Sequence, residues 1–151
     1  MNHTGWLPDL EPTTEWKHRG ITCRVYSLRR GDGLFQHNGY VELPEDHPAR
    51  PLDLQFDDVD VFDVHGGITY GGDGARVIGW DTDHPGDASP WLPERGGRVW
   101  TVNDVKDETT RLADQVADLY TPETIAMHKA ATQLRELADE LDPMKKESTD
   151  A

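Results

Sequence analysis

Two short motifs between residues 65 and 87 hold the side chains of this chain that are best suited to chemistry. Residues 65–70 have the sequence His-Gly-Gly-Ile-Thr-Tyr, and residues 79–87 have the sequence Gly-Trp-Asp-Thr-Asp-His-Pro-Gly-Asp. An imidazole can act as an acid or a base near neutral pH. We therefore predict a candidate site at these two motifs, which a strand hairpin would carry to its loop ends.

Four of these side chains are candidate metal ligands: His65, Asp81, His84 and Asp87. Imidazole and carboxylate ligands together suit zinc, manganese or iron. A divalent metal there would lower the pKa of a bound water and so create a nucleophile. One hypothesis is therefore a metal-dependent hydrolase. The competing interpretation is that the aspartates are ordinary turn formers beside Pro85 and Gly86.

The adjacent glycines Gly66 and Gly67 support a second hypothesis. Glycines let backbone N–H groups approach a ligand closely and form an anion-binding concavity, and His65 beside them could act as an acid or a base. The alternative is a β-bulge that needs a positive φ. We favour a protein that binds a small polar, nucleotide-like ligand. The residues predicted to bind it are His65, Gly66, Gly67, Thr69, Tyr70, Asp81, His84, Asp87, Asn38 and Tyr40.

Aromatic rings near these motifs are further candidates, because bases and sugars stack on them. They are Tyr40, Tyr70, Trp80, Trp91 and Trp100, with Asn38 and Arg76 as polar companions. The alternative is that the tryptophans form the core of a chain that has few aliphatic residues. No Walker loop, Rossmann fingerprint, nucleophile elbow or His-Glu-x-x-His motif occurs in the sequence. The sequence therefore does not decide whether the protein is an enzyme. His37, His47 and His128 are predicted to lie on the surface.

Composition limits the classes of partner. The 151 residues carry a formal net charge of −14, with a mean hydropathy of −0.74. Nonspecific binding to nucleic acid needs clustered cations, so it is not expected. A further alternative is an acidic protein-interaction module, such as a DNA mimic or an inhibitor of a host factor, with its carboxylates at Asp57, Asp58, Asp60 and Asp63. The single cysteine, Cys23, fits a reducing compartment, and no apolar run is long enough to span a membrane. A cytoplasmic location is expected.

The hydrophobic pattern predicts strands before helices. Strands are expected over residues 19–30, 35–43 and 59–64, followed by a hairpin of residues 68–70 and 76–81. Helices are expected over residues 101–119, with Thr101 and Asp104 as a capping box, and from Thr121 to Pro143, with Pro122 at the first position. This order predicts an α+β fold: a mainly antiparallel sheet of four to five strands, with both C-terminal helices packed on one face. Residues 1–18 would form a polar arm, residues 19–142 the single domain, and residues 143–151 a disordered tail.

Several motifs together resemble an uncharacterised family of small proteins found in bacteriophages and bacterial mobile regions. The resemblance covers roughly residues 36–119 and includes both site motifs, in the forms HGGxTY and GxDxxHxGD. It also includes residues 38–41 with Pro44, the pair at 47–48, and the pair Trp100-Thr101 at the start of the first helix. The resemblance implies an accessory protein of phage origin, and it implies no particular chemistry.

Overall fold

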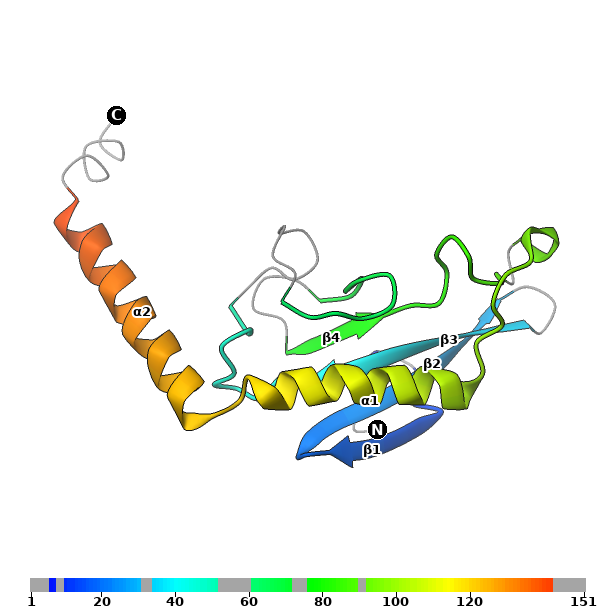
Figure 1. Cartoon of the computed structure of the whole chain (residues 1–151), viewed down its shortest axis with the longest axis horizontal. Helices are drawn as coiled ribbons and strands as arrows, with labels where there is room; N and C mark the ends of the chain where they lie inside the picture. The colour runs from blue at the N-terminus through cyan, green and yellow to red at the C-terminus, as the bar shows by residue number, and fades with distance from the viewer. Residues whose placement is uncertain are drawn as a thin grey trace.

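A four-stranded antiparallel sheet followed by two helices confirms the predicted α+β class (Figure 1). The computed structural model describes residues 6–7, 10–30, 34–51, 61–71, 76–89 and 92–142. The strands β1 (Thr14–His18), β2 (Ile21–Arg30), β3 (Leu34–Glu42) and β4 (Val77–Trp80) lie in the sheet in that order. Neither described helix is long and apolar enough to cross a membrane.

Strand β1 corrects the prediction that residues 1–18 form an arm. Its alternate residues Thr14, Trp16 and His18 are half-buried, while Glu15 and Lys17 face solvent, which is the period-two pattern of an edge strand. A tight turn at Arg19 and Gly20, both with positive φ, folds β1 back onto β2. The pairing places Trp16 opposite Cys23. The segment before Trp16 is polar and contains Pro8 and Pro12, which favoured an arm over a strand.

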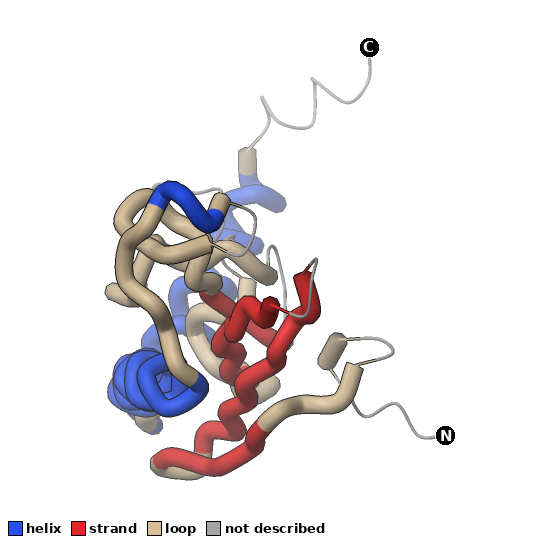
Figure 2. Tube along the Cα trace, turned by 90° about the vertical axis from the view of Figure 1, so that its right-hand side faces the viewer, coloured by secondary structure: helices blue, strands red, loops and turns tan. Residues whose placement is uncertain are grey.

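The main core lies between the sheet and helix α1 (Val102–Asp118). From the sheet, Ile21, Cys23 and Val41 are buried, and from the helix Val105 and Leu112 are fully buried. Seen end-on in Figure 2, α1 lies on one side of the strands. The predicted capping box is present, because Thr101 Oγ1 accepts from Asp104 N and Asp104 Oδ2 accepts from Thr101 N. The capping residues thus set the start of α1, and its buried face packs against the sheet.

A smaller apolar cluster covers the opposite face of the sheet. Tyr26, Tyr40 and Val77 are buried there, with Trp6 and Leu7 packed against them. The Tyr26 and Tyr40 rings meet edge to face at 5.4 Å. Alternate residues of β2 point to opposite faces of the sheet. Both faces are covered by apolar clusters, so β2 has apolar residues at odd and at even positions.

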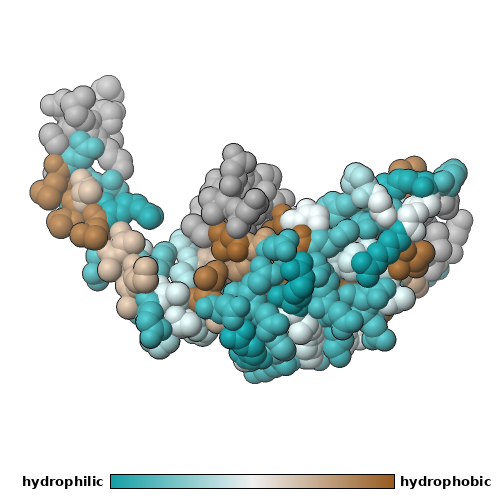
Figure 3. Space-filling model, in the orientation of Figure 1, coloured by the Kyte–Doolittle hydropathy of each residue, from teal (hydrophilic) through white to brown (hydrophobic). Residues whose placement is uncertain are grey.

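Helix α2 (Pro122–Leu141) has the bounds that its cap and Pro143 predict, but its packing differs from the prediction. No residue of α2 is buried, and the helix projects away from the sheet (Figure 1). Only α1 therefore packs on the sheet. Figure 3 shows apolar side chains along this projecting helix. The apolar stripe in the sequence indicated that α2 has a face to cover but did not indicate what covers it.

The segment before the candidate site is less regular than predicted. Residues 61–64 do not form a strand, and residues 59–60 lie outside the described part of the chain. Of the predicted hairpin, only β4 is a strand, and the 68–70 segment reaches it through a single bridge between Tyr70 and Gly79. A turn at residues 64–67 bends the chain, so only its last residues meet the free edge of β4.

Candidate functional site

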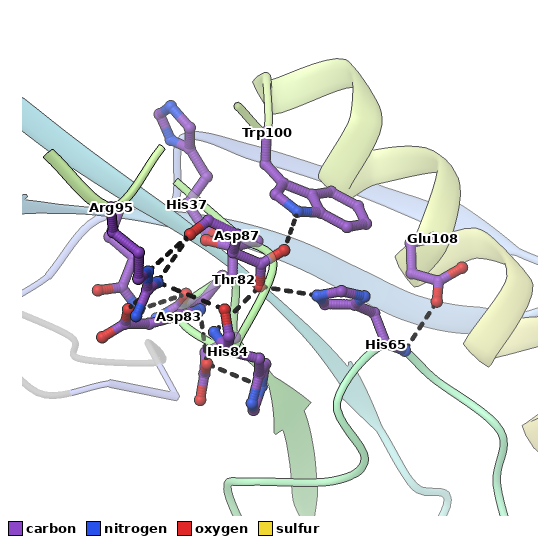
Figure 4. A network of polar contacts seen from close by, with 12 residues as sticks. His37, His65, Thr82, Asp83, His84, Asp87, Arg95, Trp100 and Glu108 are labelled. Atoms are coloured by element: carbon purple, nitrogen blue, oxygen red, sulfur yellow. Dashed lines mark hydrogen bonds and ion pairs between the residues drawn. The ribbon is translucent and has the colours of Figure 1, made fainter. Parts of the chain in front are cut away.

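Asp87 is the centre of the candidate site (Figure 4). Its side chain is 2% exposed and accepts three hydrogen bonds. The donors are His65 Nε2 at 2.8 Å, the backbone N–H of His84 at 3.0 Å and Trp100 Nε1 at 2.8 Å. A buried carboxylate is tolerated only when it is satisfied in this way. Asp87 thus connects the two predicted motifs to the start of α1.

A tight loop holds Asp87 in this position. Its backbone N–H donates to the His84 carbonyl at 2.9 Å, which closes the turn through Pro85 and Gly86. Its own carbonyl accepts from Arg95 Nε at 3.1 Å and from Arg95 Nη2 at 2.7 Å. Arg95 also reaches Asp83 at 3.2 Å. One guanidinium therefore ties the last five residues of the second motif, Asp83 to Asp87, to the loop that follows them.

The charge of Asp87 is favoured despite its burial. Burial by itself would raise the pKa of the carboxyl group, but the hydrogen bonds from His65, Trp100 and the His84 N–H outweigh it and lower that pKa. The side chain is consequently an ionised carboxylate near neutral pH. An ionised carboxylate can only accept hydrogen bonds, so the proton at His65 must sit on Nε2.

The His65 ring is fixed in orientation and in tautomer. It lies 4.6 Å from the Trp100 ring and 5.6 Å from the His84 ring, measured between ring centroids. Its backbone N–H donates to Glu108 Oε2 of α1 at 2.8 Å. In the described part of the chain no residue bonds to Nδ1 of His65, and the side chain is 29% exposed. In the neutral ring, Nδ1 therefore carries a lone pair that can accept a hydrogen bond or a proton.

Gly66 allows the two histidines to approach each other. It lies in the turn that Gly67 N closes by donating to the Val64 carbonyl at 2.9 Å, and its φ is +70°. A Cβ at Gly66 would overlap the His84 ring. Glycine is favoured here for two reasons: the turn has a positive φ, and the His84 ring leaves no room for a Cβ. Because the Gly67 N–H already has a partner, this turn is a poorer anion site than the sequence suggested.

The second pair, Asp81 and His84, is looser than the first. His84 Nε2 lies 3.0 Å from Asp81 Oδ1, yet without the geometry of a hydrogen bond. This buried nitrogen has no hydrogen-bond partner among the described residues. Asp81 Oδ1 instead accepts from the Asp83 N–H at 3.0 Å. The pair is an ion pair only when His84 is protonated.

The four predicted metal ligands thus meet, but they pair with one another. Within the described residues, which include all four, no three His, Cys, Asp or Glu side chains are placed to hold a metal ion. Asp87 already accepts three hydrogen bonds. The arrangement therefore gives the metal hypothesis no geometric support.

An open polar hollow of about 250 Å³ lies beside Trp100 and Glu108, and neither His65 nor Asp87 is among its lining residues. It is lined by Arg98, Trp100, Asp104, Asp107, Glu108 and Arg111. Trp100 and Glu108 also contact His65, so the hollow and the histidine share two walls. Burial of Glu108 opposes its charge, but hydrogen bonds from Arg111 and from the His65 N–H outweigh this effect and lower the pKa of the carboxyl group. The hollow presents two guanidinium groups and three carboxyl groups.

The other predicted binding residues lie away from His65. Tyr40 is buried in the cluster on the opposite face of the sheet, where burial raises the pKa of its hydroxyl to about 12. The exposed Tyr70 ring stacks edge to face on Tyr40 at 5.3 Å. Asn38 is buried and accepts from Gln36 at 3.1 Å, and Thr69 contributes its backbone N–H to the bridge with Gly79. These four residues support the sheet.

The remaining candidates lie in the core, on the surface or outside the described residues. Trp80 is a core residue whose Nε1 donates to the buried Thr109 hydroxyl at 3.0 Å. Trp91, Asp57, Asp58 and Asp60 lie outside the described residues, and Asp63 pairs with Arg111 at 3.1 Å in a segment that is not a strand. His47 corrects the surface prediction: it is 1% exposed, and its ring bonds to Val116 O and Ala49 N. Those bonds to backbone explain its burial.

Sequence reasoning missed the polar roles of Trp100, Glu108 and Arg95. Glu108 follows Val105 by three residues and precedes Leu112 by four, so it lies on the buried stripe of α1. A carboxylate within an apolar stripe is a signal of a paired or functional group. Trp100 gave a weaker signal, and Arg95 in a Gly- and Pro-rich loop gave none.

Together these contacts define an α+β protein whose candidate site is a histidine held by a buried carboxylate beside a polar hollow. Comparison of the chain with protein-family models, with curated proteins and with solved structures finds no match in any of the three.

Proposed function

We propose that the chain is a binding protein for a small, polar, nucleoside-like ligand, which it holds beside His65. The observation that carries the proposal is the state of the His65 ring. Asp87 fixes the proton on Nε2, and Nδ1 is left as an acceptor with no partner among the described residues. An oriented acceptor in a partly exposed ring is the kind of polar group that fixes a ligand in a binding site.

The hollow next to His65 favours the ligand class. Arg98 and Arg111 line the hollow with donors, and Asp104, Asp107 and Glu108 line it with acceptors. Arg111 pairs with Glu108 at 2.7 Å and Arg98 pairs with Asp104 at 3.8 Å, so a ligand would share or replace these ion pairs. A ring that carries both amine and carbonyl groups can use both kinds of partner. A phosphate would face three carboxylates in a chain that already carries a net charge of −14. A neutral base or nucleoside therefore suits the hollow better than a nucleotide phosphate does.

The biological setting is a separate part of the proposal. The resemblance of residues 36–119 to phage proteins supports an accessory protein that acts in the cytoplasm of the host cell. That resemblance rests on the motifs alone, so the binding experiment does not depend on it.

Isothermal titration calorimetry tests the proposal with free bases, nucleosides and nucleoside 5′-monophosphates. We expect at least one base or nucleoside to bind, and its monophosphate to bind more weakly. His65→Ala should abolish binding, with His128→Ala on α2 as the control that keeps wild-type binding. Melting temperatures should be measured on the same preparations, because removing His65 deprives Asp87 of one donor.

Asp107→Ala provides a second variant that does not touch Asp87. The Asp107 side chain is exposed and lines the hollow, so its removal should change affinity without changing the melting temperature. Failure of every base and nucleoside to bind the wild-type protein would overturn the proposal. Binding that survives both His65→Ala and Asp107→Ala would place the ligand elsewhere.

A further inference from the structure

Helix α2 carries an apolar stripe that no other segment in the described part of the chain buries. Met127 is 71% exposed, Leu134 67%, Leu137 51% and Leu141 72%. Single exposed apolar side chains are ordinary on a protein surface, but a contiguous set marks an interaction site. In proteins, most helical stability comes from the packing of an apolar face rather than from intrinsic propensity, and no residue of this 20-residue helix is buried. The helix therefore has both an exposed apolar surface and a need for a partner.

The spacing of the stripe is that of a coiled-coil seam. Met127, Ala130, Leu134, Leu137 and Leu141 follow one another at alternating intervals of three and four residues. This interval places every member on one narrow line along the helix, as in the a and d positions of a heptad. The positions that flank the line include Ala131 and Ala138, whose small side chains let a second helix approach closely.

We propose that two copies of the chain associate through this seam, with their α2 helices antiparallel. Charge supports a second copy in this orientation. The C-terminal half of α2 carries Glu136, Asp139, Glu140 and Asp142, and its last turn has no basic residue. Carboxylates at a helix C-terminus are unfavourable, whereas the N-terminal end of a neighbouring helix attracts them. The antiparallel arrangement brings these ends together, and a parallel arrangement would set the acidic halves side by side.

Side-chain size supports the same arrangement. When Leu134 of one copy faces Leu137 of the other, Leu141 faces Ala130, so a large side chain meets a small one. The end of the second helix then arrives near an apolar hollow of about 200 Å³ at the base of α2. The hollow is lined by Pro48, Ala49, Val61, Leu119, Thr124 and Met127. It extends the apolar seam onto the domain itself.

Sedimentation velocity of the full chain over a range of concentrations tests the association. The seam is short, so we expect a weak dimer whose population rises with concentration. Leu134→Gln/Leu137→Gln should be monomeric throughout. Thr132→Gln/Arg135→Lys is the matched control: it makes the same number of changes next to the same residues, keeps the net charge and lies off the seam. It should dimerise like the wild type.

Disulfide cross-linking tests the orientation. The single variants Ala131→Cys and Ala138→Cys are oxidised separately and then as a mixture of the two. The disulfide between the cysteines at positions 131 and 138 should form in preference to the 131–131 and 138–138 disulfides. A wild-type chain that stays monomeric at all concentrations overturns the proposal. It is overturned in that case even if another protein binds α2. A dimer that persists in Leu134→Gln/Leu137→Gln overturns it as well, and a predominance of symmetric disulfides overturns the antiparallel arrangement.

Discussion

The two histidine–carboxylate pairs of the candidate site lie next to each other but differ in how their carboxylates are held. Asp87 is 2% exposed and accepts from His65, His84 and Trp100, whereas Asp81 is 26% exposed and accepts one backbone N–H. The first carboxylate determines the tautomer and orientation of its histidine. The second leaves a buried nitrogen of His84 without a hydrogen bond. The comparison separates a fixed part of the site from a part that can rearrange.

Removing the Asp87 carboxylate should have the largest effect. Asp87→Ala leaves three donors from separate segments without their acceptor, and each buried donor left unsatisfied costs about 1–3 kcal/mol. Urea denaturation should therefore show a large loss in the free energy of unfolding, with Asp81→Ala as the control. Equal losses in the two variants would contradict the distinction between the pairs.

Substitution of Gly66 should have the next largest effect. Gly66→Ala places a side chain at a φ of +70° and against the His84 ring, and strained backbone alone costs on the order of 1–3 kcal/mol. Gly67→Ala is the control, because Gly67 also has a positive φ, +81°, but a Cβ there would meet nothing within 4 Å. The difference between the two variants in unfolding free energy measures the His84 contact. If they lose the same stability, the contact with His84 contributes nothing.

Acid should weaken the fixed pair. The pKa of Asp87 is lower in the folded chain than in the unfolded chain, so its ionisation stabilises the fold above the unfolded value of about 3.9. That contribution disappears as the pH falls through the folded pKa. The gap in unfolding free energy between the wild type and Asp87→Asn should therefore narrow from neutral pH toward pH values below about 4. Other carboxylates are present in both proteins and largely cancel, so a constant gap would show that Asp87 is not the titrating group.

The sequence predicted those parts of the fold that local chemistry determines. The bounds of α1 and α2 follow from Thr101, Thr121 and Pro122, because caps act within a few residues. The packing of α2 could not be predicted, since an apolar stripe does not name its partner. The strand at Thr14–His18 was missed because its pairing with β2, rather than its own composition, makes it a strand.

The sequence predicted which residues of the site lie close together, but it did not predict which of them form hydrogen bonds with one another. His65, His84 and Asp87 do come together, as their types and spacing suggested. Their pairing depends on Trp100 and on Glu108 of α1, which are distant in sequence from His65. A metal site and a hydrogen-bonded carboxylate use the same residue types. Only the number of donors that reach Asp87 distinguishes them, and that number is set by tertiary packing.

The smallest effect is expected at the looser pair. Asp81→Asn keeps an amide oxygen that can accept from the Asp83 N–H, and it removes a charge from a half-exposed group whose contact with His84 is not a hydrogen bond. Partly exposed ion pairs contribute little, so the free energy of unfolding should change by less than about 0.5–1 kcal/mol. Urea denaturation beside Asp87→Asn, which makes the same chemical change at the fixed pair, gives the direct test. A loss at Asp81 as large as that at Asp87 would mean that both carboxylates are structural and that neither histidine is free to adjust to a ligand.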